Sequence, residues 1–244
     1  MLGIFQKCLA VRSTETEAFS LIAALASRSP PGALAPFLPT VLQLLLMRFQ
    51  AQASNGRFAG LLVQAICHLA AVLGPKAVVD GGLEAVQAGM FTMLLTQVFG
   101  RGLEAKPPAG AEAKAAMIGM ARILCESDTV KTSPPAFTAL LGFLVGVMDP
   151  ATAGKGAAAA DDDDEGAGEE VATGDAFSRL HFTGGDGDED YFPEVPDGPA
   201  AACAALAALA AASPGVVGPR AAALPPAQAA SLAAHCTRAG VALS

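Results

Sequence analysis

A chain of 244 residues can form one large domain or a short array of repeats, and its composition narrows the choice. Hydrophobic residues make up 52% of the chain, and alanine, leucine and glycine dominate while tryptophan is absent, which favours helix over sheet. The net charge of −8, without a basic stripe that carries interleaved aromatic residues, argues against nucleic-acid binding.

The first predicted helices lie before residue 55. Residues 2–11 have the pattern of a helix already in progress, which suggests a fragment of a longer protein. A second helix begins at Thr14, which forms a capping-box pattern with Glu17, and runs to about residue 27. Two prolines end it, and a third apolar stripe predicts a helix over residues 34–49.

Six more stripes of apolar residues at helical spacing follow, separated by Gly-Pro, Pro-Pro and Asp-Pro breaks. The helices are expected at 58–73, 83–98, 113–125, 137–148, 200–212 and 227–239. The last two are rich in alanine. Each pair of helices has one apolar stripe per helix and cannot close a core alone, so neighbouring pairs must stack.

The predicted pairs begin near residues 14, 57 and 112, a spacing of roughly 40–55 residues, close to the HEAT and armadillo period of ≈ 40–47. A plain helical bundle would show the same amphipathicity. We predict an all-α, HEAT/armadillo-like α-solenoid of about four helix pairs. Its expected parts are helix pairs over 1–148, an acidic insert with an apolar clip over 149–197, and a final helix pair over 198–244.

The acidic residues are concentrated in the insert. Residues 149–197 hold 15 of the 23 acidic residues and two of the 15 basic ones, so the remainder carries a net charge of +5. The densest runs are Asp161, Asp162, Asp163, Asp164, Glu165, Glu169 and Glu170. Such a run cannot bury enough apolar area to offset its ordering entropy. We expect a flexible acidic arm that binds a basic partner, or else a solvating insert without a further role.

An apolar phrase within the insert allows two interpretations. Phe177, Leu180 and Phe182 could be a clip that packs onto the preceding repeat and covers its apolar end. They could instead contact a partner inside the superhelix. The clip is the favoured interpretation, because an apolar phrase after a charged run usually anchors it.

A membrane protein is the alternative that the apolar composition raises. Residues 29–47 and 58–75 lack charge, but the first stretch contains four prolines. The second is about 18 residues, at the lower limit for a ~30 Å hydrocarbon core. Residues 1–7 lack a basic leader followed by an apolar region. A small multi-span membrane protein is therefore the less favoured reading, and we expect no membrane insertion.

Catalytic and thiol chemistry are not indicated. The five cysteines are odd in number and widely spaced, without Cys-x-x-Cys or a histidine pair at zinc spacing, as in a cytosolic or nuclear protein with reduced thiols. Cys67 and His68 are adjacent inside an apolar helix and therefore do not face each other. A packed cysteine and a partly exposed histidine are expected there, and no catalytic residue.

Metal and cofactor sites are not indicated either. The aspartates at 186, 188 and 190 match the first three ligand positions of a calcium loop. Tyr191, however, stands where that loop needs glycine, and Asp197 where it needs glutamate. No glycine-rich phosphate loop follows a predicted strand. We expect no bound metal and no cofactor.

Short phrases spread over nearly the whole chain resemble, in order, the C-terminal part of the CAS-type exportins, the importin-α re-exporters of the karyopherin-β family. They are Gly3-Ile4-Phe5-Gln6-Lys7, Pro30-Pro31, Leu44-Leu45 with Arg48 and Gln50, Gln87-Ala88-Gly89-Met90-Phe91, Lys114 to Gly119, Ala176-Phe177-Ser178-Arg179-Leu180-His181-Phe182 and Ser213-Pro214-Gly215. The alanine-rich helices and the enlarged run 161–170 depart from the family pattern.

This resemblance implies the C-terminal HEAT repeats of a nuclear export receptor that shuttles between nucleus and cytoplasm. It also implies importin-α and Ran-GTP as partners, with Ran-GTP bound mainly through N-terminal repeats that are missing from this chain. A generic HEAT-like scaffold for protein interactions is the alternative function. A partner pulldown would separate the two.

Overall fold

The computed structural model describes residues 2–30, 32–52, 55–149 and 190–243, and in these ranges it is helical without a strand. The first helices are α1 (Leu2–Ala10), α2 (Glu15–Arg28), α3 (Leu38–Ala51) and α4 (Gly56–Leu73). Next come the π-helix η3 (Lys76–Leu83), α5 (Glu84–Val86), α6 (Met90–Leu94), the π-helix η4 (Leu95–Phe99) and α7 (Gly100–Ala105). The chain continues with α8 (Gly110–Glu126), α9 (Asp128–Lys131), α10 (Pro134–Met148), α12 (Gly198–Ala212), α13 (Val217–Ala222) and α14 (Pro226–Arg238).

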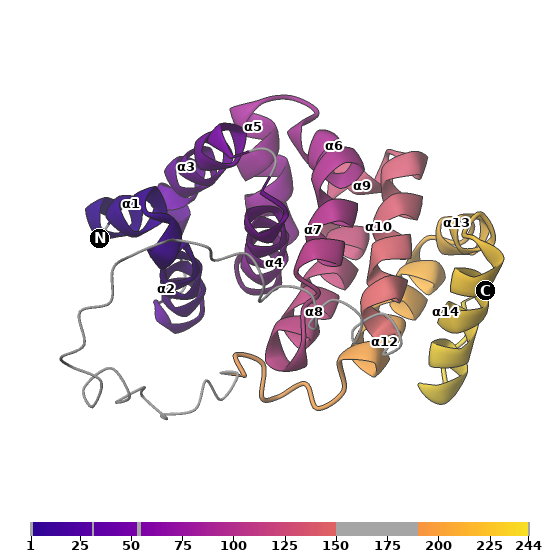
Figure 1. Cartoon of the computed structure of the whole chain (residues 1–244). Coiled ribbons are helices and arrows are strands. Elements are labelled where there is room, and N and C mark those ends of the chain that lie inside the picture. Colours follow the sequence, from indigo (N-terminus) through magenta and orange to yellow (C-terminus); the bar gives the residue numbers. More distant parts are fainter. Residues whose placement is uncertain (1, 31, 53–54, 150–189, 244) are drawn as a thin grey trace.

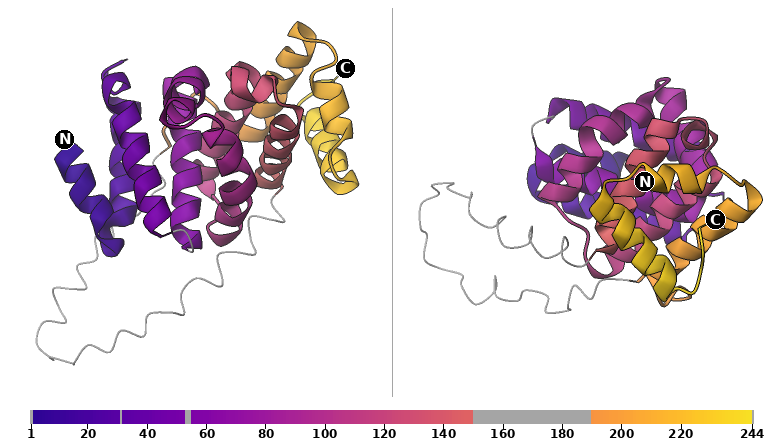
Figure 2. Two further views of the ribbon diagram at one scale, coloured as in Figure 1. Left: turned by 90° about the horizontal axis from the view of Figure 1, so that it is seen from above. Right: turned by 90° about the vertical axis from the view of Figure 1, so that its right-hand side faces the viewer.

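The helices are arranged in two layers that alternate along the chain. Helices α2, α4, α8 and α12 form one layer, called here the α2–α12 layer, in which α4 packs between α2 and α8, and α8 between α4 and α12 (Figure 1). In the second layer α1 packs on α3, α3 on η3, η4 on α10, and α10 on α13 and α14. The helices of both layers follow one another in chain order from the N-terminal to the C-terminal end (Figure 2, left). This confirms the predicted all-α, HEAT-like solenoid.

The hydrophobic core is continuous from Phe5 in α1 to Cys236 in α14. Aromatic side chains also join neighbouring helices. Phe19 of α2 meets Phe58 of α4 edge to face with ring centroids 5.4 Å apart. Continuous burial is what a stacked array requires, since no single pair can exclude water from its own apolar stripe.

Helix α4 packs between α2 and α8 and is an apolar helix of 18 residues. It is long and apolar enough to cross a membrane, and so is the bent combination of Lys76–Val86 and Met90–Ala105, which turns by 94°. However, 72% of α4 is buried against other helices, including α2, α7 and α8. The buried core helix of a helical array meets the same criteria of length and composition. The length and composition of α4 are therefore weak evidence for a membrane span.

The predicted capping box at the start of α2 is wrong. Thr14 precedes α2, but its side chain makes no hydrogen bond to the first turn. The Thr14 hydroxyl instead donates to the carbonyl oxygens of Cys8 and Val11, at 2.8 and 3.2 Å. Because α1 ends so close to α2, its unpaired C-terminal carbonyls compete for this hydroxyl. Asn55 does cap a helix, since its side chain accepts from the Phe58 amide at 3.2 Å.

The helix predicted over 83–98 is interrupted. The chain turns at Gln87–Gly89, and Gly89 adopts a φ of +79°, a left-handed conformation that favours glycine. The Glu84 carboxylate closes the turn by accepting from the amides of Gly89 and Phe91, at 2.6 and 3.0 Å. The apolar stripe continues on both sides of the turn, so periodicity alone gives no sign of the break.

We expect burial at the α2–α4 contact to contribute strongly to stability. Phe58 is fully buried, whereas Phe37, at the start of α3, is 49% exposed. Phe58→Ala should lower the free energy of unfolding by about 3–5 kcal/mol, because it removes buried contacts and leaves a cavity. Phe37→Ala, the matched control, should change it by less than about 1 kcal/mol. Urea denaturation followed by circular dichroism measures both, and equal effects of the two variants would contradict this packing.

Candidate protein-interaction site

The partner-binding residues predicted from sequence lie outside the residues that the structure describes. These are Asp161, Asp162, Asp163, Asp164, Glu165, Glu169, Glu170, Phe177, Leu180 and Phe182. The described chain stops at Asp149, just after α10, and resumes at Asp190. The structure therefore neither joins these residues into a site nor separates them.

A segment just beyond them is docked on the α2–α12 layer. Residues 190–195, called here the strap, lie across α4 and α8 before the chain enters α12. Phe192 is buried and packs with Ala71 of α4 and Ala115 of α8 in a small apolar cluster. Tyr191 and Val195 pack around this cluster. The strap thus covers part of one face of the α2–α12 layer.

Lys114 of α8 fastens the strap through three hydrogen bonds. Its ammonium group donates to the Asp190 carboxylate and to the carbonyl oxygens of Phe192 and Val195, the last two at 2.9 and 2.8 Å. An ammonium group has three N–H donors, so this arrangement uses all of them. The hydrogen bond from Lys114 also lowers the pKa of the Asp190 carboxyl below its usual range.

The strap is folded locally by two short-range hydrogen bonds. The Asp190 side chain accepts from the Phe192 amide at 3.0 Å, and the Phe192 carbonyl accepts from the Val195 amide at 3.0 Å. Beyond the strap, the Asp197 side chain caps α12 by accepting from the Ala200 amide at 3.0 Å. The strap is therefore held to α8 by polar contacts and to α4 by apolar contacts, and the chain enters α12 shortly after it.

His68 lies beneath the strap. It is buried, with 7% of its surface exposed, so the partly exposed histidine expected from sequence is wrong. Tyr191 and Phe192 cover it with ring centroids at 5.0 and 5.9 Å, and its Nε2 is 2.9 Å from the Ser27 hydroxyl of α2. Sequence could not show this, because the covering residues are more than a hundred positions away. Burial lowers the pKa of His68 below its usual value.

The adjacent Cys67 does not have the properties of a catalytic nucleophile. It is fully buried, and burial raises the pKa of its thiol to about 12, far from the thiolate that a nucleophile needs. All five cysteines are free thiols. Within the described ranges, no group of three or more histidine, cysteine or acidic side chains could hold a metal ion.

Sequence reasoning missed the strap and Lys114. Tyr191 and Phe192 follow the second acidic cluster directly, and Tyr191 is the single tyrosine of the chain. That local change from acidic to aromatic residues was the available signal for a docked segment. Lys114 begins one of the phrases that resemble the family, but nothing in the sequence indicated its contact with the strap, because a lysine in the first turns of an amphipathic helix usually faces solvent.

Two layers of stacked helices in the described ranges define a helical-repeat protein. The family model for the C-terminus of CAS/CSE proteins matches residues 1–235. The chain belongs to this family and represents the C-terminal region of an exportin-type transport receptor. The comparison with curated proteins gave no match, and neither did the comparison with solved structures.

Removing the Lys114 charge should release the strap. Lys114→Met deletes the hydrogen bonds to two carbonyl oxygens, which from a charged donor contribute about 1.5–3 kcal/mol each. Acrylamide quenching of tyrosine fluorescence reports the strap alone, because Tyr191 is the single tyrosine and tryptophan is absent. We expect clearly stronger quenching in Lys114→Met than in the wild type.

Lys76→Met is the matched control for this experiment. The Lys76 side chain is 69% exposed and its ammonium lies 3.7 Å from the Asp128 carboxylate, away from the strap. This variant should quench like the wild type. If Lys114→Met also quenched like the wild type, the strap would not depend on Lys114.

The buried His68 should make stability depend on pH. Its folded-state pKa is lowered from the ordinary 6.5, so the unfolded chain binds a proton at higher pH than the folded protein does. The free energy of unfolding should therefore fall as pH drops below about 6.5, and be fully retained above it. His68→Gln cannot titrate and should show a weaker loss of stability between about pH 7 and about pH 5. Urea titrations of both proteins measure this, and parallel pH profiles would show that His68 is not the titrating group.

Proposed function

We propose that the chain is the C-terminal HEAT-repeat portion of a receptor that returns importin-α from nucleus to cytoplasm together with Ran-GTP. The family match over residues 1–235 carries this proposal, because it covers nearly the whole chain and fits the observed helical array. On this proposal the protein shuttles between the two compartments. It acts through contact surfaces, without catalysis and without a cofactor.

The α2–α12 layer supports a binding role for one face of the array. In helical-repeat proteins the stacked rows create an extended surface for partners. Here the strap occupies part of that surface at α4 and α8, where a short turn of polypeptide is held by burial of Phe192 and by hydrogen bonds from Lys114. A partner segment could be held by the same kind of contact along the rest of the layer.

We propose that the acidic run 161–170 contributes long-range attraction to a basic segment of the partner. The strap begins at Asp190, and residues 149–197 carry 15 of the 23 acidic residues. Such a concentration of one charge raises the rate of encounter with a basic surface more than it strengthens the final contact. Phe177, Leu180 and Phe182 are proposed to anchor this segment, with direct partner contact as the alternative.

Ran-GTP is proposed to bind mainly through repeats outside this chain. Coupling between two ligands of a receptor is reciprocal, since each tightens the other through a shared conformation. A chain that holds only part of the contact area still loses the full translational and rotational freedom on association. It makes fewer of the favourable contacts that offset this loss. The division into helix pairs over 1–148, an insert over 149–197 and a final pair over 198–244 is the working scheme for this proposal.

We expect this chain alone to bind importin-α weakly. The dissociation constant should exceed about 1 μM. It should rise with added salt, because exposed charges are screened over ~8–10 Å at physiological ionic strength. Ran-GTP should tighten the complex little. Isothermal titration calorimetry at low and high salt, with and without Ran-GTP, measures all three effects.

A variant with asparagine at positions 161–164 is the matched control for the salt effect. It should bind more weakly at low salt and lose most of the salt dependence. Nanomolar, salt-insensitive binding that Ran-GTP strongly enhances would show that this chain holds the coupled site. The absence of any importin-α binding, with other proteins captured instead, would favour a generic interaction scaffold.

A further inference from the structure

An open cleft lies along the surface where α10 meets α13 and α14. One part, of about 560 Å³, lies between the first turns of α10 and α13, and a second part, of about 430 Å³, lies between α10 and the start of α14. Both parts share Pro135 and Thr138, so they form one groove along α10. The walls are mainly apolar and include Pro134, Phe143 and Leu224. The groove is of the size that small ligands and peptide side chains occupy.

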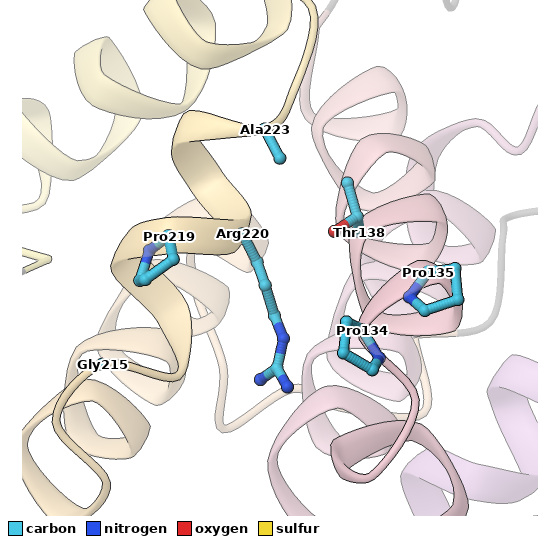
Figure 3. Close-up of a pocket in the computed structure, with 7 residues that line it drawn as sticks. All are labelled: Pro134, Pro135, Thr138, Gly215, Pro219, Arg220 and Ala223. Carbon is cyan, nitrogen blue, oxygen red and sulfur yellow. The ribbon is translucent and has the colours of Figure 1, made fainter.

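Arg220 of α13 is fixed at one end of this groove. Its side chain extends from α13 toward Pro134 of α10 (Figure 3). The guanidinium lies 4.6 Å from the centroid of the Phe137 ring and donates to the carbonyl oxygens of Val216 and Lys131, at 3.2 and 3.1 Å. A guanidinium has five N–H donors, so three are not used by these two hydrogen bonds. Because three contacts already hold it, little side-chain entropy would be lost on binding.

The charge of Arg220 is not matched by a carboxylate in the described ranges. Its contacts there are two carbonyl oxygens and an aromatic ring, none of which carries a negative charge. Helix α10 contains no charged residue, and residues 198–243 contain Arg220 and Arg238 but no aspartate or glutamate. The groove is therefore apolar along its length and positive at one end.

We propose that this groove binds an extended acidic and apolar segment of a protein partner. A carboxylate of the segment pairs with the free N–H groups of Arg220, and apolar side chains on either side fill the two parts of the groove between α10, α13 and α14. A guanidinium recognises a carboxylate through paired hydrogen bonds, which gives direction as well as strength. The apolar walls supply the remaining contact, since their burial needs no polar partner.

A selection of displayed peptides tests this inference without a known partner. Random short peptides are selected against the whole chain at low salt, and the enriched sequences are synthesised and measured by fluorescence anisotropy. We expect enrichment of aspartate or glutamate flanked by leucine, phenylalanine or other large apolar residues. Replacement of the acidic residues of a selected peptide by their amides should weaken binding by about tenfold or more.

Variants of the chain locate the binding to the groove. Thr138→Glu places a carboxylate on the groove wall, where it competes for Arg220 and repels an acidic segment, and should weaken binding by about tenfold or more. Thr138→Gln introduces a side chain of the same size as glutamate but without its charge. It should bind within about threefold of the wild type. Arg220→Gln should resemble Thr138→Glu, with thermal melting as the check that it is folded.

Three results would overturn the inference. Enriched peptides without acidic residues would show that Arg220 does not bind a carboxylate of the segment. Equal binding to wild type and to Thr138→Glu would place the contact elsewhere on the chain. Failure to enrich any peptide would show that the groove is not a docking site. Because Thr138→Glu leaves the contacts of Arg220 with Phe137, Val216 and Lys131 in place, the test stands even if Arg220→Gln does not fold.

Discussion

The close approach of α4 and α8 is the constraint on which the rest of the array depends. At Gly119 of α8 the backbone lies directly against the backbone of Cys67 in α4, and a Cβ at that position would overlap the Cys67 carbonyl. A second close approach joins α4 to α7, where a Cβ on Gly102 would come within 2.8 Å of the Ala59 backbone. Glycine is required at both positions because a Cβ atom would have no room there. The backbone conformation itself would allow other residues. Helix α4 is thereby held between its neighbours as the central helix of the array.

The strap depends on this contact. Phe192 packs against Ala71 and Ala115, one residue from each of the two helices, so its binding surface exists only where they meet. Lys114 then fixes the backbone of the strap, and His68 loses its contact with water as a consequence. A local property of one glycine thus sets the geometry of a surface that α2, α4 and α8 share. In a helical-repeat protein such a surface is where partners bind.

The sequence predicted the regular part of this structure well. Apolar stripes identified α4 within two residues, and the alternation of stripes with proline breaks predicted the array. The turn at Gly89 was missed because the stripe is apolar on both sides of it, and α9 and α13 because four and six residues carry no readable period. The predicted partner-binding residues lie outside the described ranges, whereas the strap and the groove at Arg220 arise from contacts between distant segments. Such contacts leave no mark in a single sequence, since Lys114 and Arg220 look like ordinary surface residues.

The close contact of α4 and α8 is tested most directly by comparing the free energies of unfolding of two variants, Gly119→Ala and Gly146→Ala. Both glycines lie inside helices, where alanine gains up to about 1 kcal/mol by helix propensity. Among the described residues, none would lie within 4 Å of a Cβ at Gly146 of α10, so that variant should be unchanged or more stable. Gly119→Ala should instead lose about 1–3 kcal/mol or more, because α4 and α8 must move apart. A gain in stability for both variants would contradict the close contact of α4 and α8 and, with it, the surface built on that contact.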